Sequence, residues 1–286
     1  MASVAGGPPA AEPFGWHGSL HNSLHNGRMR RSIPPTHPAA GSCVVWWAAA
    51  GEPAAPTAPP SLLDSTERQR WGTFWQAADR QRYAVGVVLT RLVVGAALGQ
   101  RPEAVVIDRR CGWCERPHGR PVVAGGPAVS VSHAGGLVGV AIGPPADIGL
   151  CVGLDVEPVG ATAHVEEVAA DLLSSAEHDA LAGVQDRPAA VLRTWVRKEA
   201  ALKAIGRGLA DDPRELTVSI SAATVERWPA HQGTRRLVDL RARSGYVASL
   251  ALLAGPDGQP ALDGLDVQER DGDTVLRVVG PPLGGS

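Results

Sequence analysis

Residues 151–157, Cys151-Val152-Gly153-Leu154-Asp155-Val156-Glu157, hold the pattern from which the fold of the chain can be worked out. Side chains alternate between the two faces of an extended strand, so Asp155 and Glu157 share one face while apolar residues take the other. Proline cannot donate to a strand ladder, and Pro158 ends the strand. The stretch therefore predicts a strand that carries two carboxylates on one face.

The segments on either side of this strand alternate between strand and helix signals. The predicted strands are 43–49, 105–108, 215–220, 237–241 and 246–253, the predicted hairpin is 128–142, and the predicted helices are 61–99, 164–183 and 188–205. Their order indicates two halves of similar plan. Because helices are mixed with hairpins, we expect an α+β fold with two pseudo-symmetric α/β halves, not a doubly wound parallel sheet.

The same pattern divides the chain into four parts. Residues 1–41 are rich in Gly, Pro, His and Asn without either periodicity, and they predict a flexible N-terminal arm. We expect an N-terminal half over 42–147 and a C-terminal half over 148–256. Residues 257–286 predict a C-terminal tail, or an edge hairpin within it.

Composition limits the classes of protein to which the chain can belong. Of its 286 residues, 44% are apolar and 20% charged, enough for a folded core. A net charge of −2 without a basic stripe argues against nucleic-acid binding. No apolar stretch reaches the roughly 18 residues of a membrane-spanning helix, and the first residues lack a secretory pattern. Four cysteines make no disulfide framework here, so we expect a cytoplasmic protein.

Lys198 and Lys203 are the only lysines among 27 Lys and Arg residues, and both lie in the run Trp195-Val196-Arg197-Lys198-Glu199-Ala200-Ala201-Leu202-Lys203. A compact ammonium and a planar guanidinium are not interchangeable. Glu199 and Lys203 are four residues apart and share a helix face. They form either an ordinary surface pair or, because their neighbours are apolar, a pair facing a cleft. There Glu199 would complete a metal site or act as a base, and Lys203 would hold a phosphate.

Two further sets of polar residues have both an ordinary and a functional interpretation. Side-by-side carboxylates repel each other unless a cation lies between them, and Mg²⁺ prefers such hard oxygen ligands. Asp155 and Glu157 thus either decorate a solvent-facing edge or belong to a magnesium site. His133 ends a predicted strand at a glycine turn, where it either caps the turn or, with Ser132, binds an anion.

The stretch 153–157 and the run 195–203, about 40 residues later, together resemble the two signatures of the Sfp-type 4′-phosphopantetheinyl transferases. These signatures are a G-[IV]-D-[IV]-E strand and a W-x-x-K-E-A-x-x-K helix. Gly119-Arg120-Pro121 is similar to the family's G-K/R-P turn, and Ser132-His133 to its S-H turn. The resemblance runs from about Cys43 to Leu253.

The resemblance implies an Mg²⁺-dependent transferase of the holo-[acyl-carrier-protein] synthase type. Such enzymes move the phosphopantetheine arm of coenzyme A to a serine of an apo acyl or peptidyl carrier protein and release adenosine 3′,5′-bisphosphate. The resemblance also implies a monomer with coenzyme A between its halves, and leaves open whether the carrier serves fatty-acid, polyketide or nonribosomal peptide synthesis. The alternative is a non-catalytic module that binds coenzyme A or a carrier protein, although such a module would tolerate loss of the metal ligands.

By the same resemblance, Asp155, Glu157 and Glu199 would hold Mg²⁺ against the pyrophosphate. Lys203 would contact the pyrophosphate, and Lys198 would help to neutralise its charge. Glu199, or a water on the metal, would take the proton from the incoming serine.

The nucleotide part of coenzyme A has its own implied ligands. His133, with Ser132 nearby, would bind the 3′-phosphate, and the Gly119-Arg120-Pro121 turn would seat the adenine. Arg82 and Arg91, on the predicted helix 61–99, would hold the nucleotide's phosphates.

Three features depart from the resemblance or lie beside it. Many relatives carry Arg after the glycine of an R-x-x-x-G helix, whereas here Gly86 is followed by Val87. The stretch 111–114, with a cysteine at each end, could bind zinc with His118, but a closed site needs four ligands and no second pair follows, so we expect a reduced loop. Glu177 is either a helper acid near the metal or part of a solvated helix face.

Overall fold

The computed structural model describes residues 41–51, 61–111, 114–117, 119–146, 149–207, 211–256, 262 and 264–277. All of them lie in one compact unit, Ile33–Ser286. The predicted flexible arm, apart from Gly41, lies outside the described residues.

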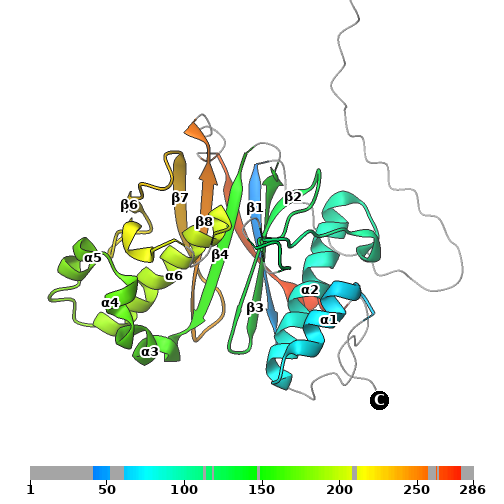
Figure 1. Ribbon diagram of the computed structural model, residues 1–286, viewed down its shortest axis with the longest axis horizontal. Helices are drawn as coiled ribbons and strands as arrows, with labels where there is room; N and C mark the ends of the chain where they lie inside the picture. The colour runs from blue at the N-terminus through cyan, green and yellow to red at the C-terminus, as the bar shows by residue number, and fades with distance from the viewer. Residues whose placement is uncertain are drawn as a thin grey trace, which may run out of the picture. The chain divides into compact units, whose positions relative to one another are not determined.

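The described part of the chain contains strands in three sheets and helices between them (Figure 1). The strands are β1 (Ser42–Ala49), β2 (Pro127–Ala134), β3 (Leu137–Pro145), β4 (Cys151–Pro158), β5 (Thr217–Val218), β6 (Val225–Arg227), β7 (Thr234–Leu240), β8 (Tyr246–Ala254) and β9 (Asp266–Asp271). The α-helices are α1 (Ser65–Thr73), α2 (Ala77–Leu98), α3 (Thr162–Glu167), α4 (Ala169–Leu172), α5 (Ser175–Ala180), α6 (Arg187–Ile205) and α8 (Gly272–Leu276).

The two larger sheets repeat one plan. In the first sheet, of order β2-β3-β1-β9, strand β1 is followed by helices and then by the hairpin β2–β3, whose second strand pairs antiparallel with β1. In the second sheet, of order β4-β8-β7, strand β4 is followed by helices and then by β7 and β8, of which β8 pairs antiparallel with β4. The expected α+β class is confirmed. The exact limits 42–147 and 148–256 of the two halves stay a prediction.

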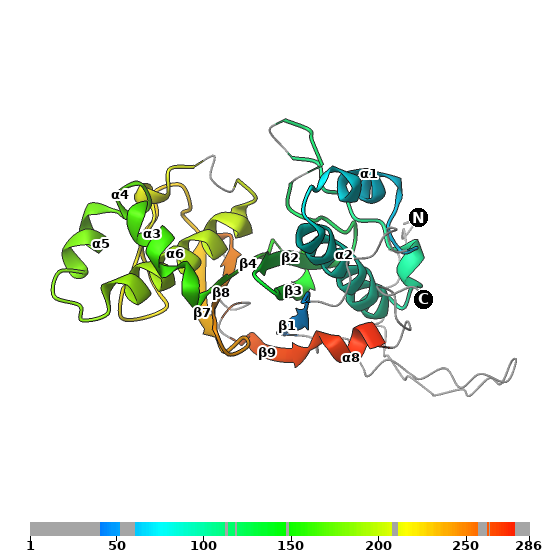
Figure 2. The same cartoon turned by 90° about the horizontal axis from the view of Figure 1, so that it is seen from below.

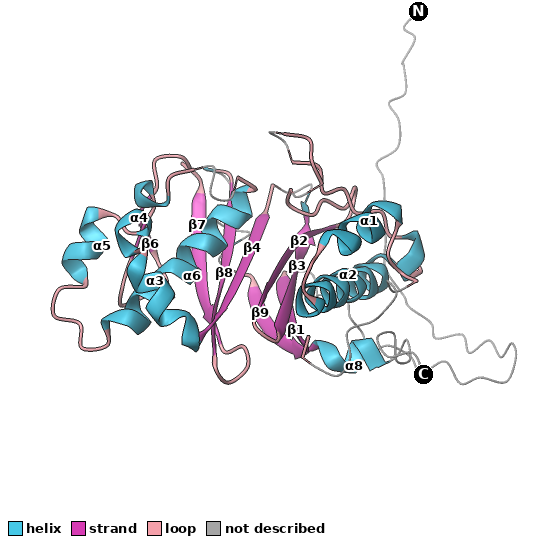
Figure 3. Cartoon of the chain, turned by 60° about the horizontal axis from the view of Figure 1, so that its bottom comes forward, coloured by secondary structure: helices cyan, strands magenta, loops and turns pink. Residues whose placement is uncertain are grey.

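Each of the two larger sheets packs against one long helix, the first against α2 and the second against α6. Figure 3 shows the strands between α3–α6 on one side and α1 and α2 on the other, and Figure 2 shows the same from below. Strand β4 and helix α6 approach so closely that a Cβ on Gly153 would lie 1.9 Å from the carbonyl oxygen of Ala200. The glycine of the 153–157 stretch therefore lets the helix with Glu199 and Lys203 pack directly on the strand with Asp155 and Glu157.

The two sheets meet where β2 lies beside β4. The backbone N–H of Leu154 donates a 2.9 Å hydrogen bond to Ser130 Oγ, and both Ser130 and Ser132 are buried. These serines alternate with valines along β2, so the polar face of the hairpin is turned toward the strand with the carboxylates. The junction of the sheets thus brings Ser132 next to Asp155.

The helix predicted over 61–99 consists of two helices. Asp64 and Glu67 form a capping box that starts α1, and residues 74–76 leave the helical conformation before α2 begins. The break lets the Phe74 ring pack on the Tyr83 ring with centroids 5.3 Å apart. In the second half, the predicted helix 164–183 is three short helices, α3, α4 and α5.

Two other expectations about secondary structure differ from the structure. The predicted strand 105–108 is an irregular segment after a 3₁₀ turn, in which Val106 is 79% exposed and only Asp108 forms a β-bridge, with Val122. Part of the predicted tail, 266–276, forms β9 and α8, with β9 pairing parallel to β1 as a single edge strand. The local sequence of such a segment gives no signal that it will pair with a strand far away in the chain.

Helix α2 is long and apolar enough to cross a membrane by length and composition alone. However, 72% of its apolar window is buried inside the protein, as in the central helix of a core. Its buried side chains, with those of β1 and β3, form the largest apolar cluster of the first half.

Candidate active site

Asp155, Lys203 and Ser132 form a polar cluster where β4, α6 and β2 meet. Lys203 Nζ lies 2.5 Å from Asp155 Oδ1 and donates a 3.0 Å hydrogen bond to Ser132 Oγ. Ser132 in turn donates a 3.0 Å hydrogen bond to Asp155 Oδ1. Asp155 is 2% exposed, whereas the Lys203 side chain is 31% exposed, so the ammonium closes the cluster toward solvent.

Glu199 and Glu157 add two carboxylates to this cluster. Glu199 lies one turn before Lys203 on α6, and its Oε1 atom is buried without a hydrogen-bond partner, as is Oδ2 of Asp155. Burial and then the neighbouring Asp155 raise the pKa of Glu157 to about 7, with Lys203 opposing and Glu199 adding to the rise. Burial, with Asp155, also raises the pKa of Glu199.

Lys203 responds to the same negative charge. Burial works to lower its pKa, but the carboxylates of Asp155, Glu199 and Glu157 outweigh burial, and the pKa is raised. Lys203 is therefore charged at neutral pH. One ammonium group does not neutralise the charge of three carboxylates. The pKa values of Glu157 and Glu199 therefore stay raised in spite of Lys203.

The donor set fits a divalent cation in its chemistry. Hard carboxylate oxygens suit Mg²⁺, and the unpartnered oxygens of Asp155 and Glu199 are the kind of buried polar atom that a cation would satisfy. Within the described ranges, however, no group of three or more His, Cys, Asp or Glu side chains is arranged to hold a metal. One reason is that Lys203 Nζ already occupies the space beside Asp155 Oδ1.

Lys198 lies elsewhere, contrary to its predicted place at the pyrophosphate. Five residues along a helix amount to about 140°, so Lys198 and Lys203 cannot share a face. Lys198 is fully buried, and its Nζ lies 2.5 Å from Glu177 Oε2. Glu177, 1% exposed, also accepts the backbone N–H groups of Ser174 and Val218. The interpretation of Glu177 as part of a solvated helix face was wrong, because it is buried. Its role as a helper acid stays a prediction, although Lys198 and two backbone N–H groups already engage its carboxylate.

A cavity of about 190 Å³ lies beside the hairpin tip. Its walls come from α1, α2, β2 and the described residues around Arg109 and Gly119, and the lining residues are Arg70, Phe74, Tyr83, Gly86, Val87, Arg109, Pro117, Gly119, Val131 and His133. Two of the residues expected to bind the nucleotide, Gly119 and His133, therefore share one cavity. Although His133 is exposed to solvent, desolvation of its ring lowers its pKa, and the cations Lys203 and Arg82 lower it further.

Two arginines in this cavity were missed by the sequence reasoning. Arg70 lies with its guanidinium 5.7 Å from the centre of the Phe74 ring and 6.0 Å from that of Tyr83. Arg109 has a buried Nε without a hydrogen-bond partner. Neither residue belongs to a motif, and they come together because both line the cavity, Arg70 from α1 and Arg109 from the irregular segment after the 3₁₀ turn.

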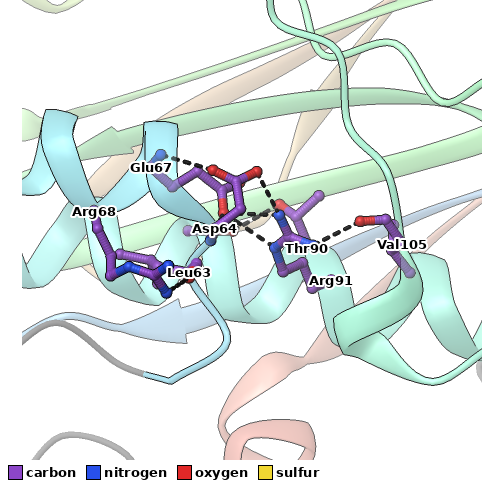
Figure 4. Close-up of polar contacts among 8 residues, drawn as sticks. Leu63, Asp64, Glu67, Arg68, Thr90, Arg91 and Val105 are labelled. Carbon is purple, nitrogen blue, oxygen red and sulfur yellow. Dashed lines mark hydrogen bonds and ion pairs between the residues drawn. The ribbon is translucent and has the colours of Figure 1, made fainter.

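Arg91, predicted to hold a phosphate, is part of the core (Figure 4). It is 3% exposed, and its guanidinium lies within hydrogen-bond distance of the carboxylates of Glu67, at 2.8 Å, and Asp64, at 2.9 Å. Nη1 also donates to the carbonyl oxygen of Val105. All three nitrogen atoms of Arg91 are engaged, so it has no place in a phosphate site.

Arg82 and Arg120 also make structural contacts. Arg82 pairs with Asp79 and donates a 2.8 Å hydrogen bond to the carbonyl oxygen of Gly135 at the hairpin tip. Arg120 Nη1 donates a 3.0 Å hydrogen bond to the carbonyl oxygen of Ala204, one of the last unpaired carbonyls of α6. Pro121, next to it, is partly buried and does not line the cavity.

The zinc hypothesis for the cysteine loop stays untested, because His118 lies outside the described residues. Cys111 is half-buried and Cys114 is exposed. Gly119, which follows His118, leaves no room for a side chain, since a Cβ there would lie 2.5 Å from the carbonyl oxygen of Arg110.

Comparison with known proteins agrees with the motifs at the level of the superfamily. Residues 151–252 match the family model described as the 4′-phosphopantetheinyl transferase superfamily, which confirms the resemblance for the segment that carries Asp155, Glu157, Glu199 and Lys203. A similar solved structure is that of a holo-(acyl-carrier-protein) synthase from Bacillus anthracis str. Ames in complex with CoA (3′,5′-ADP). It is 13% identical, with a TM-score of 0.31, over 37% of this chain and 96% of that chain. No curated protein matches the chain.

Proposed function

We propose that the chain is a magnesium-dependent enzyme that transfers the 4′-phosphopantetheine arm of coenzyme A to a serine of an apo acyl or peptidyl carrier protein. The observation that carries the proposal is the cluster of Asp155, Glu157 and Glu199 around Lys203, with two unpartnered carboxylate oxygens. This cluster is built from both superfamily motifs. Its products would be the holo carrier protein and adenosine 3′,5′-bisphosphate.

Transfer of a phosphoryl group requires positioning and neutralisation of charge more than covalent help from the protein. Lys203, charged and partly open to solvent, is placed to contact the pyrophosphate as a point charge. Asp155, Glu157 and Glu199 would hold Mg²⁺, which when bound would neutralise charge on the transferring phosphoryl group. Glu199, whose pKa is raised, is a suitable acceptor for the proton of the serine hydroxyl.

The nucleotide would occupy the cavity beside the hairpin tip. Arg70, Arg109 and His133 supply positive or hydrogen-bonding groups for the 3′-phosphate, and Phe74 and Tyr83 supply aromatic surface for a base. Arg70 and Arg109 would thus take the part that the resemblance assigned to Arg91, and the part of Arg82 stays a prediction. Val87, in place of the usual arginine, lines the same cavity, so the two arginines from other elements would compensate for it.

The alternative is a module that binds coenzyme A or a carrier protein without catalysis. A binder gains nothing from burying carboxylate oxygens without partners, because each such group costs about 1–3 kcal/mol. The unpartnered oxygens of Asp155 and Glu199 are easier to explain in an enzyme that takes up a cation.

The test is to mix the protein with coenzyme A, Mg²⁺ and each of several apo carrier proteins, and to weigh the carrier by mass spectrometry. We expect a phosphopantetheine adduct that requires Mg²⁺ and is absent with EDTA. Glu199→Gln should abolish transfer while coenzyme A binding stays measurable. Binding of coenzyme A without an adduct on any carrier would favour the non-catalytic alternative.

A further inference from the structure

The hairpin tip that presents His133 is fixed from three sides. The turn residues Gly135 and Gly136 join β2 to β3. The carbonyl oxygen of Gly135 accepts a hydrogen bond from Arg82, and that of Gly136 accepts one from the backbone N–H of Ala50 at 2.8 Å. The backbone N–H of Gly136 donates a 2.9 Å hydrogen bond to the hydroxyl oxygen of Tyr246. Of these three partners, only Tyr246 belongs to the second sheet.

The turn is shaped to receive the Tyr246 hydroxyl. Gly135 has a φ of +53°, a conformation that glycine adopts at little cost. A Cβ on Gly135 would lie 2.9 Å from the Tyr246 hydroxyl oxygen, so any side chain would push the two apart. The absence of a side chain at Gly135 therefore leaves room for the Tyr246 hydroxyl, which also accepts the hydrogen bond from Gly136.

Tyr246 also adjoins the strand of the acidic cluster. It is the first residue of β8, where it pairs with Pro158 of β4, and its neighbour Val247 pairs with Glu157. Tyr246 thus stands at one end of the β4–β8 ladder and reaches with its hydroxyl to the tip that carries His133. Tyr246 therefore connects the end of the strand that carries Glu157 with the hairpin tip that carries His133.

We propose that Tyr246 is a positioning residue that sets the separation between the pyrophosphate site and the 3′-phosphate site. The proposal rests on the proposed function, in which the pyrophosphate and the 3′-phosphate of one coenzyme A molecule contact Lys203 and His133. A ligand held by two of its groups binds well only if the two sites lie at the right distance. Tyr246 would contact neither phosphate group and would act through Gly136.

The proposal predicts a selective effect of removing one hydroxyl. Tyr246→Phe keeps the ring but leaves the N–H of Gly136 without its acceptor, so the tip would be held on two sides only. Coenzyme A, which has a 3′-phosphate, should lose affinity by roughly three- to tenfold, the range expected for one hydrogen bond. 3′-Dephospho-coenzyme A, which does not use His133, should bind the variant and the wild type equally well.

The experiment is isothermal titration calorimetry of the full-length protein with both nucleotides, in the presence of Mg²⁺, for the wild type, Tyr246→Phe, His133→Ala and the double variant. The double variant should lose no more preference for coenzyme A than His133→Ala alone, because Tyr246 acts through the same tip. Thr274→Val is the control, since it removes an exposed hydroxyl that donates to the carbonyl oxygen of Asp271, and it should leave the affinities of both nucleotides unchanged.

The outcomes separate this proposal from the proposed function. If Tyr246→Phe weakens both nucleotides equally, or neither, the positioning role is wrong even though the wild type binds coenzyme A. The positioning role would also be wrong if the losses of preference for coenzyme A caused by Tyr246→Phe and His133→Ala add up in the double variant. If the wild type binds coenzyme A and 3′-dephospho-coenzyme A with the same affinity, His133 does not bind the 3′-phosphate, and the positioning role of Tyr246 is wrong as well. If the wild type binds neither nucleotide, it is the proposed function that fails.

Discussion

Lys203 occupies a position in which a guanidinium group cannot make the same contacts. Its Nζ reaches Asp155 Oδ1 and Ser132 Oγ at once, whereas arginine presents its donors in a larger, rigid plane. We expect Lys203→Arg to lower kcat of phosphopantetheine transfer by roughly 100-fold or more, as for loss of one preorganised donor that stabilises charge. The reverse exchange, Arg193→Lys at an exposed position of the same helix, is the control and should leave kcat unchanged. An active Lys203→Arg would mean that any cation serves.

Glu157 gives the metal-free protein a specific pH dependence. Its pKa is raised from 4.5 to about 7 by burial and by Asp155, so the folded state holds a proton that the unfolded state has already lost. The free energy of unfolding should therefore fall as pH rises from about 4.5 to about 7, and level off above that. Urea unfolding at pH 5, 6, 7 and 8 with EDTA measures this slope.

Two changes should reduce this pH dependence of the free energy of unfolding. Glu157→Gln takes away the titrating group, so the remaining pH dependence over this range should be smaller than in the wild type. Saturating Mg²⁺ favours the ionised carboxylate and should stabilise the protein more at pH 8 than at pH 6. A slope that is the same in Glu157→Gln would assign the titration to another group.

At the scale of single residues, periodicity predicted more than composition did. The alternation in 153–157 and the four-residue spacing of Glu199 and Lys203 correctly placed these side chains on shared faces, and the structure brings them together. The five-residue spacing of Lys198 and Lys203 already indicated different faces, and that signal was not used. Tyr246 was beyond prediction, because its partner Gly136 lies far away in sequence. Arg70 lies only four residues before Phe74, but no local pattern shows that Arg70 and Arg109 line one cavity.

At the scale of elements, the buried pair Lys198–Glu177 joins three of them. Glu177 on α5 accepts from Lys198 on α6 and from the backbone of β5, so it connects a short helix and a two-residue strand to the long helix. Both side chains are almost fully buried. Neither α5 nor β5 is long enough to be stable without such contacts.

Removal of the Lys198 ammonium should therefore lower the stability of the fold without a direct effect on the catalytic step. We expect Lys198→Met to lower the free energy of unfolding by about 3–5 kcal/mol, because it leaves the Glu177 carboxylate buried without its cation. The double variant Lys198→Met/Glu177→Gln should recover part of this loss, since no buried charge remains. Urea unfolding measures both. A Lys198→Met protein of normal stability whose kcat is reduced would return Lys198 to the active site.

At the scale of the whole described unit, the chain closes on itself through its last strand. The two halves were visible in the order of predicted elements, since each contributes a strand, helices and a hairpin. The return of β9 to the edge of β1 was not, because a parallel partner more than 200 residues away leaves no mark in the local pattern. Glu269 on β9 shows why this return matters for both sheets.

Glu269 connects β1, β9 and the turn between β7 and β8. Its carboxylate accepts the indole N–H of Trp47 at 2.8 Å and the backbone N–H groups of Arg241 and Ala242 at 2.8 and 2.9 Å. Ala242 has a φ of +44°, which a residue with a side chain adopts only where its surroundings hold it.

We expect Glu269→Leu to lower the free energy of unfolding by about 2–4 kcal/mol, since three donors lose their acceptor. Urea unfolding followed by tryptophan fluorescence and circular dichroism should show one transition shifted to lower urea. Glu226→Leu, at an exposed position on β6, should shift it little, and an equal shift in both variants would contradict the connecting role of Glu269.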